Sequence, residues 1–202
     1  MKKVFMLLCL VLVVLSFGCK DSDLEKKKAF EDDYKYYMDE AVVDALGWDW
    51  FDKASYNKVF DEHVFVKSTF EEVKSAMEGK EKVVIYFGYN PKLYQCPYCA
   101  TALPIANEAA LENGVSKILY LDIFQIRKDE TDEYKWLRSF IQEQIPDFGE
   151  KILVPDFYVI ENGKILSHHI ATFKDEEGKY IKDLTDIQKE ELKNVYNEMF
   201  KE

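Results

Sequence analysis

The chain has 202 residues, the size of one domain, and its 38 acidic residues outnumber its 27 basic residues to give a net charge of −11. A surface this acidic repels nucleic acid and anionic lipid headgroups, and the sequence contains neither a basic stripe nor a glycine-rich phosphate loop. These features exclude nucleic acid as a partner.

The N-terminus resembles the signal of a bacterial lipoprotein. Two lysines precede an apolar stretch over residues 4–17, which is shorter than the roughly twenty residues that a membrane span needs. Gly18 then stands directly before Cys19 and a charged segment. The resemblance implies that residues 1–18 are a signal peptide and that Cys19 carries a lipid, which would anchor the protein on the extracytoplasmic face of the cell membrane. An uncleaved N-terminal anchor is the alternative, and it would also export the domain.

Residues 19–62 are predicted to form a tether and an N-terminal helical extension. The charged run 21–28 is interpreted as the solvated tether. Apolar residues at three- and four-residue spacing then predict one amphipathic helix from Ala29 to its end near Gly47. The residues of this apolar stripe are Phe30, Tyr34, Tyr37, Met38, Ala41, Val42 and Leu46.

An aromatic cluster follows, formed by Trp48, Trp50, Phe51, Tyr56 and Phe60. It is either a peptide-binding surface beside an active site or a helix and loop packed on the domain.

The region 63–202 is predicted to be one domain of alternating strands and helices. A first strand is expected at His63–Lys67, and Ser68 with Glu71 predicts a capping box for a helix that runs to Met77. The run Lys82–Gly88 has the length and composition of a buried central strand.

The second half of this domain continues the alternation. A helix interrupted by Pro104 is expected up to Asn113, followed by a buried strand, a helix, a hairpin and a last helix. The turn signal of the hairpin is Asn162-Gly163. The expected ranges are 117–123 for the strand, 134–145 for the helix, 157–160 and 165–171 for the hairpin, and 185–200 for the last helix with Ile187, Leu192, Val195, Met199 and Phe200 facing inward.

The motif Cys96-Pro97-Tyr98-Cys99 lies between the central strand and the next helix. Thiols at i and i+3 on the first turn of a helix can form an easily exchanged disulfide. Cys96 also lies near the unpaired N–H groups and the positive end of the helix dipole, which favour its thiolate. Because Cys9 would leave with the signal peptide and Cys19 would be acylated, these two remain as thiols. They are therefore redox-active or metal-bound.

Metal binding is the weaker of these interpretations. A closed zinc site needs about four ligands, and the chain has three histidines, His63, His168 and His169. Adjacent strand residues face opposite ways, so His168 and His169 could not both join the thiols. A Cu(I) site with two sulfurs and one histidine stays open. We predict no cofactor and no metal.

The order of elements from residue 63 resembles the thioredoxin fold. Cys96 and Cys99 open the helix after a central strand, Pro104 lies five residues beyond Cys99, and Pro155 precedes the hairpin glycine Gly163 by eight residues. The resemblance implies an α/β protein with a central mixed sheet flanked by helices, extended by the N-terminal helical segment and one inserted helix.

Within that superfamily, the phrase from Phe87 to Cys99 is similar to the thioredoxin-like bacteriocin transport accessory proteins of Gram-positive bacteria. This similarity implies a thiol–disulfide oxidoreductase in which Cys96 attacks, Cys99 resolves and Pro155 shapes the substrate groove. Pro97 and Tyr98 would tune the redox poise. The implied partners are cysteine-containing exported proteins or peptides and a membrane electron donor or acceptor.

Two residues depart from the thioredoxin pattern. Gln95 replaces the tryptophan before the first cysteine, and Tyr86 stands near the place of a buried acid, so no evident proton acceptor for Cys99 is visible.

The alternative function is a non-catalytic thioredoxin-like lipoprotein that holds a peptide or delivers Cu(I).

Overall fold

The computed structural model of the chain describes residues 22–201. The predicted signal peptide and Cys19 lie outside the described residues. Within the described part, no helix combines the length and the apolar character needed to cross a membrane.

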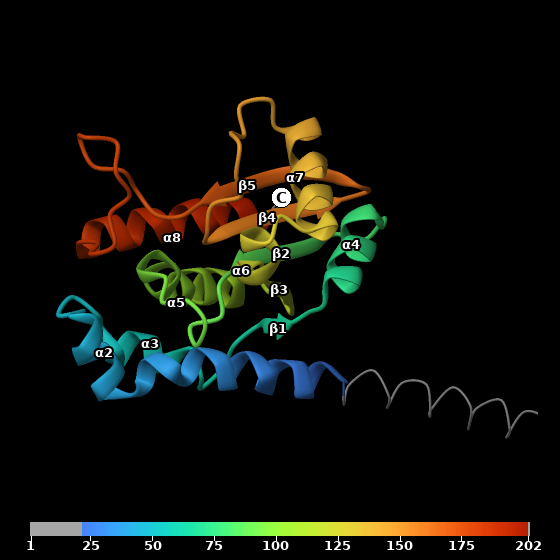
Figure 1. Cartoon of the computed structure of the whole chain (residues 1–202). Coiled ribbons are helices and arrows are strands. Elements are labelled where there is room, and N and C mark those ends of the chain that lie inside the picture. The colour runs from blue at the N-terminus through green and yellow to red at the C-terminus, as the bar shows by residue number, and fades with distance from the viewer. Residues whose placement is uncertain (1–21, 202) are drawn as a thin grey trace, which may run out of the picture.

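A five-stranded mixed sheet forms the centre of the molecule, in the order β1-β3-β2-β4-β5 (Figure 1). The central strand β2 pairs parallel with β3 and antiparallel with β4, and β1 adds to the far side of β3 in parallel. The strands are β1 (Phe65–Lys67), β2 (Val83–Gly88), β3 (Ile118–Asp122), β4 (Asp156–Glu161) and β5 (Lys164–Ile170).

The hairpin between β4 and β5 turns at Asn162 and Gly163, as predicted. Both residues have positive φ, 53° and 73°, which is the backbone of a two-residue type I′ turn. Asparagine and glycine are the residues that adopt this conformation most easily, so the turn fixes the antiparallel pairing.

Helices cover both faces of the sheet. On one face α5 packs against α8, and on the other α4 and α7 pack against the strands. The helices of the domain are α4 (Phe70–Glu78), α5 (Pro97–Glu112), α6 (Phe124–Lys128), α7 (Asp132–Gln144) and α8 (Asp186–Lys201). The strand and helix order is that of a thioredoxin fold, with the crossover from β3 to β4 carrying both α6 and α7.

The central strands are buried on both faces because their side chains alternate between two cores. Tyr86 and Phe157 stack at 4.5 Å between centroids in the core beneath α5 and α8. Ile85 and Tyr158 belong to the core beneath α4 and α7.

The N-terminal extension differs from the single predicted helix. Residues 22–34 are helical, so most of the segment interpreted as a tether is structured. A 3-10 helix (Lys35–Met38) follows, and α2 (Glu40–Leu46) is a separate helix. The break occurs at Asp39, whose extended backbone and side chain cap α2 by accepting the Ala41 N–H at 3.0 Å. An aspartate that caps a new helix interrupts the preceding one, because its side chain bonds to the backbone ahead of it. The spacing of the apolar residues gives no sign of this interruption.

The extension packs on the β1 edge of the sheet, where its first helix runs beside β1 (Figure 1). Phe30 stacks on Phe65 of β1 with ring centroids 4.8 Å apart, and Lys27 donates to the carbonyl of His63 at 2.9 Å. The aromatic cluster of 48–60 lies in the same core, with Trp48 and Tyr56 buried. It follows α2 and contains α3 (Lys53–Lys58).

The capping box of α4 lies one residue beyond the predicted one. Thr69 accepts the Glu72 N–H at 3.3 Å, and the Glu72 carboxylate accepts the Thr69 N–H at 2.9 Å. Ser68 instead donates to the carbonyl of Val66. Both Ser68/Glu71 and Thr69/Glu72 satisfy the three-residue spacing, so the sequence pattern alone selects the wrong pair.

The prediction that Ile187 faces inward is wrong, since 74% of this residue is exposed. The buried residues of α8 are Leu192, Tyr196, Met199 and Phe200, and these recur at three and four residues. Ile187 lies five residues before Leu192, which places it about 140° away around the helix.

We therefore predict a large difference between two alanine variants of α8. Leu192→Ala should lower the free energy of unfolding by roughly 2–5 kcal/mol because it empties part of a packed core. Ile187→Ala should change it by less than about 0.5 kcal/mol. Urea denaturation of both variants measures the difference, and equal losses would contradict the burial pattern.

Candidate active site

Cys96 caps the N-terminus of α5. Its backbone is extended, with φ −92° and ψ 109°, and its sulfur accepts the Cys99 N–H at 3.2 Å. Pro97 occupies the first turn of the helix, where a missing N–H costs no hydrogen bond. The sulfur thus takes the place of the oxygen of an ordinary capping side chain, as the motif predicts.

The two thiols lie together in the described structure as free cysteines. The Cys99 thiol donates to the Cys96 sulfur, with the two Sγ atoms 2.6 Å apart. A disulfide bond is about 2.05 Å long, so the two sulfurs need to move only a short distance when an oxidant removes two electrons and two protons from the pair. Only 4% of Cys96 and 1% of Cys99 are exposed.

The predicted proline lies beside this pair. The Val154–Pro155 peptide bond is cis, and the Cys96 thiol is 3.8 Å from the Val154 carbonyl oxygen. Residues 96 and 155, which are far apart in sequence, therefore meet at one end of the sheet. Tyr98 points elsewhere and packs edge-on against Tyr180 at 6.2 Å between ring centroids.

Burial raises the pKa of the Cys99 thiol well above its ordinary value, and the neighbouring Cys96 adds to this effect. The polar groups of the Tyr86 side chain and the Tyr89 backbone act in the opposite direction because they favour the thiolate. Tyr86 is fully buried in β2, near the position where the thioredoxin resemblance leads one to look for a buried acid.

The extension contributes to the site through two tyrosines whose role the sequence analysis missed. Tyr37 accepts the Cys96 backbone N–H on its hydroxyl oxygen at 3.1 Å, and the Tyr34 hydroxyl lies 2.8 Å from that of Tyr86. The helical periodicity marks both tyrosines only as members of an apolar stripe. Their spacing of three residues, one helical turn, is the available signal that their hydroxyls could reach one region.

Asp156, directly after the cis-proline, was also missed. It is fully buried, its carboxylate accepts a hydrogen bond from the Tyr158 hydroxyl, and His168 Nδ1 lies 3.8 Å from Oδ1. Burial raises the pKa of Asp156 to about 7, against the lowering effects of His168 and Tyr158. A polar residue after proline at the start of a strand gives no warning of this burial.

His168 and His169 are neighbours on β5, and their side chains lie on opposite faces of the sheet, as predicted from the alternation along a strand. His168 stacks on Tyr158, and His169 packs edge-on against Tyr196 on the other face of the sheet. Among residues 22–201, no group of three or more His, Cys, Asp or Glu side chains is placed to hold a metal ion.

Exposed apolar side chains flank the redox pair on two loops. Leu93 and Tyr94 precede Cys96, and Leu153 stands two residues before the cis-proline. Such side chains offer apolar contact to an extended polypeptide that approaches the sulfur.

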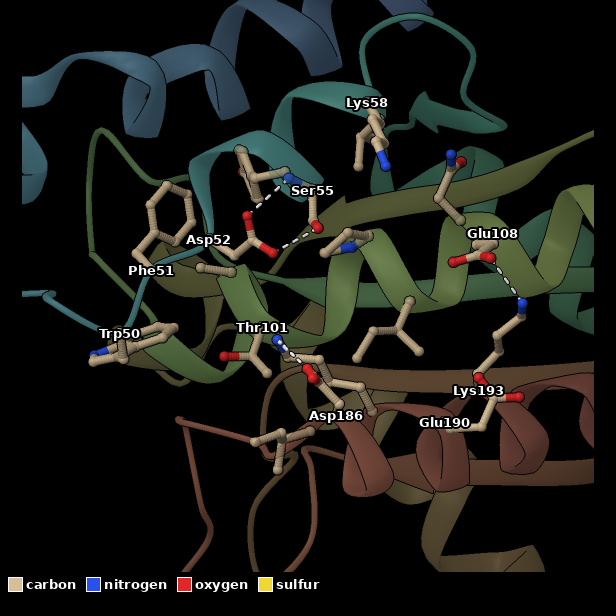
Figure 2. A pocket seen from close by; sticks show the side chains of 18 of the residues that line it. Trp50, Phe51, Asp52, Ser55, Lys58, Thr101, Glu108, Asp186, Glu190 and Lys193 are labelled. Atoms are coloured by element: carbon tan, nitrogen blue, oxygen red, sulfur yellow. Dashed lines mark hydrogen bonds and ion pairs between the residues drawn. The ribbon is translucent and has the colours of Figure 1, made fainter.

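A separate cavity of about 410 Å³ lies behind the first turns of α5. Figure 2 shows side chains of the 50–55 segment, of α5 and of α8 converging on it. Trp50, Phe51 and Pro104 are among its lining residues, and charged residues such as Asp186 and Lys193 stand around it.

Comparison with known proteins gives structural matches only. No protein-family model matches the sequence, and no curated protein matches it. A putative oxidoreductase with a thioredoxin fold aligns at 19% identity and a TM-score of 0.38, covering 54% of this chain and 83% of its own. Oxidised thioredoxin from Plasmodium falciparum aligns at 18% identity (TM-score 0.37, 67% and 99% covered), and thioredoxin O2 from Arabidopsis thaliana at 16% (TM-score 0.41, 68% and 96% covered).

The fold assignment rests on the chain's own geometry. The strand order, the cysteine pair capping α5 and the cis-proline beside it are the features of a thioredoxin fold. The described chain is therefore an α/β protein with a thioredoxin fold, extended by N-terminal helices.

The buried carboxyl group yields a pH-dependent prediction. Because the pKa of Asp156 is higher in the folded state than in the unfolded state, the wild type loses stability as pH rises from about 4 through about 7. The Asp156→Asn variant has no group that titrates at this position. Its stability relative to wild type should therefore rise by roughly 3–4 kcal/mol over that window.

Denaturant unfolding at several pH values measures this difference. The exposed Asp183 supplies the control, since Asp183→Asn should give a nearly constant difference from wild type. A constant difference for Asp156→Asn would contradict the burial of an ionisable carboxyl group.

Proposed function

We propose that this protein is a thiol–disulfide oxidoreductase that exchanges disulfides with cysteine-containing proteins or peptides through Cys96 and Cys99. The observation that carries the proposal is the Cys96 sulfur at the N-cap of α5, 2.6 Å from the second thiol and beside the cis-proline. A helix N-terminus and its N–H groups stabilise a sulfur anion, which is the nucleophile in thiol exchange.

In the reductive direction the Cys96 thiolate attacks a substrate disulfide and forms a mixed disulfide, while one substrate sulfur leaves as a thiol. Cys99 then attacks Cys96, and the second substrate sulfur leaves. The protein ends with a Cys96–Cys99 disulfide, and the substrate has gained two electrons and two protons. The reverse sequence oxidises a substrate dithiol.

The exposed side chains of Leu93, Tyr94 and Leu153 support a polypeptide substrate. Because only 4% of Cys96 is exposed, its sulfur offers a small area of contact to a macromolecular disulfide.

The cellular setting that we propose rests on residues 1–19 of the sequence. A lipid on Cys19 would hold the redox site on the extracytoplasmic face of the membrane, next to exported proteins and to a membrane electron donor or acceptor. The similarity of the 87–99 phrase to bacteriocin transport accessory proteins makes a disulfide-containing exported peptide the substrate class that we propose.

Two cysteine variants test the reaction. Cys99→Ser, incubated with insulin as a disulfide substrate, should accumulate a covalent adduct that runs as a larger band on non-reducing gels and disappears with dithiothreitol. Cys96→Ser should form none, because the capping sulfur is the attacking atom. Absence of an adduct, together with no reaction of wild-type Cys96 with iodoacetamide at neutral pH, would overturn the proposal.

The cavity behind α5 favours a second candidate function, a peptide-binding protein that uses the aromatic cluster. Its apolar walls, which include Trp50, Phe51 and Pro104, have room for a side chain or a short peptide segment. In this case Cys96→Ala would bind an exported peptide partner as wild type does, while Trp50→Ala would weaken binding. Isothermal titration with a disulfide-free candidate peptide separates the two functions, since a thiol exchanger needs Cys96 and a binder does not.

A further inference from the structure

The cap at the start of α5 lacks one of its usual partners within the helix. The Cys96 sulfur accepts the Cys99 N–H at 3.2 Å, as the side chain of a capping residue does. In an ordinary capping box the side chain of the third helical residue reaches back and accepts the N–H of the capping residue. That third residue is Cys99, whose thiol is a weak acceptor and is directed at the Cys96 sulfur. The acceptor for the Cys96 N–H therefore has to come from elsewhere in the chain.

Tyr37 of the N-terminal extension provides this acceptor. Its hydroxyl oxygen accepts the Cys96 N–H at 3.1 Å across 59 positions of sequence. Both residues are buried, with 1% of Tyr37 and 4% of Cys96 exposed. A buried N–H without an acceptor is costly, so this hydrogen bond favours the extended backbone that Cys96 needs as a cap.

The aromatic cluster of 48–60 holds the Tyr37 ring in place. Trp48 lies at 5.0 Å, Tyr56 at 5.9 Å and Phe51 at 6.2 Å from it, measured between ring centroids. Because a densely packed ring changes its orientation only when its neighbours move, the Tyr37 hydroxyl is kept at the Cys96 amide. The cluster thus supports the redox site without contacting either cysteine sulfur itself.

The same part of the extension also holds the beginning of the loop between β2 and α5. Tyr34 donates to the Tyr89 carbonyl at 3.3 Å, and the buried Asp33 carboxylate lies 3.7 Å from the Lys92 ammonium group. Together with the bond to the Cys96 amide, these contacts attach the loop to the extension at three points. The position of the Cys96 sulfur therefore depends on the extension as well as on the sheet.

We propose that Tyr37 is a positioning residue of the redox site, which completes the cap of α5 and thereby keeps the Cys96 sulfur on the Cys99 N–H. Tyr37 contacts the backbone of Cys96 and acts through it. The N–H groups at a helix start stabilise a sulfur anion, so the cap geometry governs how much thiolate is ready to attack. The proposal rests on the proposed oxidoreductase function and gives the N-terminal extension a part in it.

The Tyr37 hydroxyl keeps its proton while Cys96 titrates. Burial raises the pKa of Tyr37 well above its ordinary value, and the nearby Cys99 and Cys96 raise it further. Tyr37 thus acts as a neutral hydrogen-bond acceptor, and an effect of its removal on the pH dependence of Cys96 does not arise from ionisation of the phenol.

Alkylation of Cys96 by iodoacetamide tests the proposal. The full chain carries Cys99→Ser, which keeps the backbone N–H at that position, and the rate from pH 5 to 10 is read by mass spectrometry of the peptide that contains Cys96. Tyr37→Phe should slow alkylation at neutral pH about threefold or more and move the midpoint of the pH profile upward, because the sulfur anion loses part of its bond to the N–H. A loss of stability alone would leave the midpoint in place.

The matched control is Tyr56→Phe. Tyr56 is a buried tyrosine of the same extension, and its hydroxyl donates to the Tyr34 carbonyl at 3.2 Å. This variant keeps the ring beside Tyr37 and loses one buried hydrogen bond, so it reports the effect of that loss on stability. A Tyr37→Phe profile that coincides with the profiles of the parent chain and of Tyr56→Phe would overturn the proposal.

Two further measurements keep the role of Tyr37 testable. If wild-type Cys96 reacts with neither iodoacetamide nor a disulfide at neutral pH, the oxidoreductase function fails, and the Cβ chemical shift of Cys96 is titrated instead. An upward move of that titration in Tyr37→Phe supports the positioning role, and an unchanged titration overturns it. If Tyr37→Phe does not fold, Trp48→Phe takes its place, since it loosens the packing of the Tyr37 ring and should move the midpoint in the same direction; an unmoved midpoint counts against the proposal.

Discussion

The hydrogen bond from the Cys99 N–H to the Cys96 sulfur is the interaction on which the redox site depends. It makes one atom both the cap of α5 and the candidate nucleophile, so the start of the helix and the reactivity of the sulfur cannot be changed separately. The cap also brings the second thiol, three residues on, to the first. The sheet completes the arrangement, because β2 delivers the loop that precedes Cys96 and β4 begins directly after the cis-proline.

The core around this site contains many phenols. Eight tyrosines are fully buried, and a buried hydroxyl is costly unless it finds a hydrogen-bond partner. Tyr34, Tyr37 and Tyr86 find theirs in one another or in the backbone next to the cysteines. The cost of burying these polar groups is thus offset by hydrogen bonds, one of which joins Tyr37 to the Cys96 backbone.

The elements whose signals are local could be predicted from the sequence. The hairpin at Asn162-Gly163, the helix start at Cys96 and the buried strands all follow from a few neighbouring residues, and the structure confirms them. The errors arose where two local signals compete, as at Asp39 within an apolar stripe.

Contacts between distant residues were not predictable in this way. No periodicity indicates that the hydroxyl of Tyr37 meets the backbone of Cys96 across 59 positions, or that Asp156 is fully buried. The candidate cysteines and the proline were therefore found from sequence, and the groups that surround them were not.

The packing of the extension bears on where the chain can be divided. Phe30 lies on Phe65, and Tyr34 reaches the hydroxyl of Tyr86, so the rings of residues 22–62 form one wall of the same core as the sheet. A truncated protein that began at residue 63 would expose aromatic surface on β1 and β3 to water and would leave the Cys96 amide without its phenol acceptor. The smallest autonomous unit of this protein is thus larger than its thioredoxin-like part, and its first helix is as much an interior element as any strand.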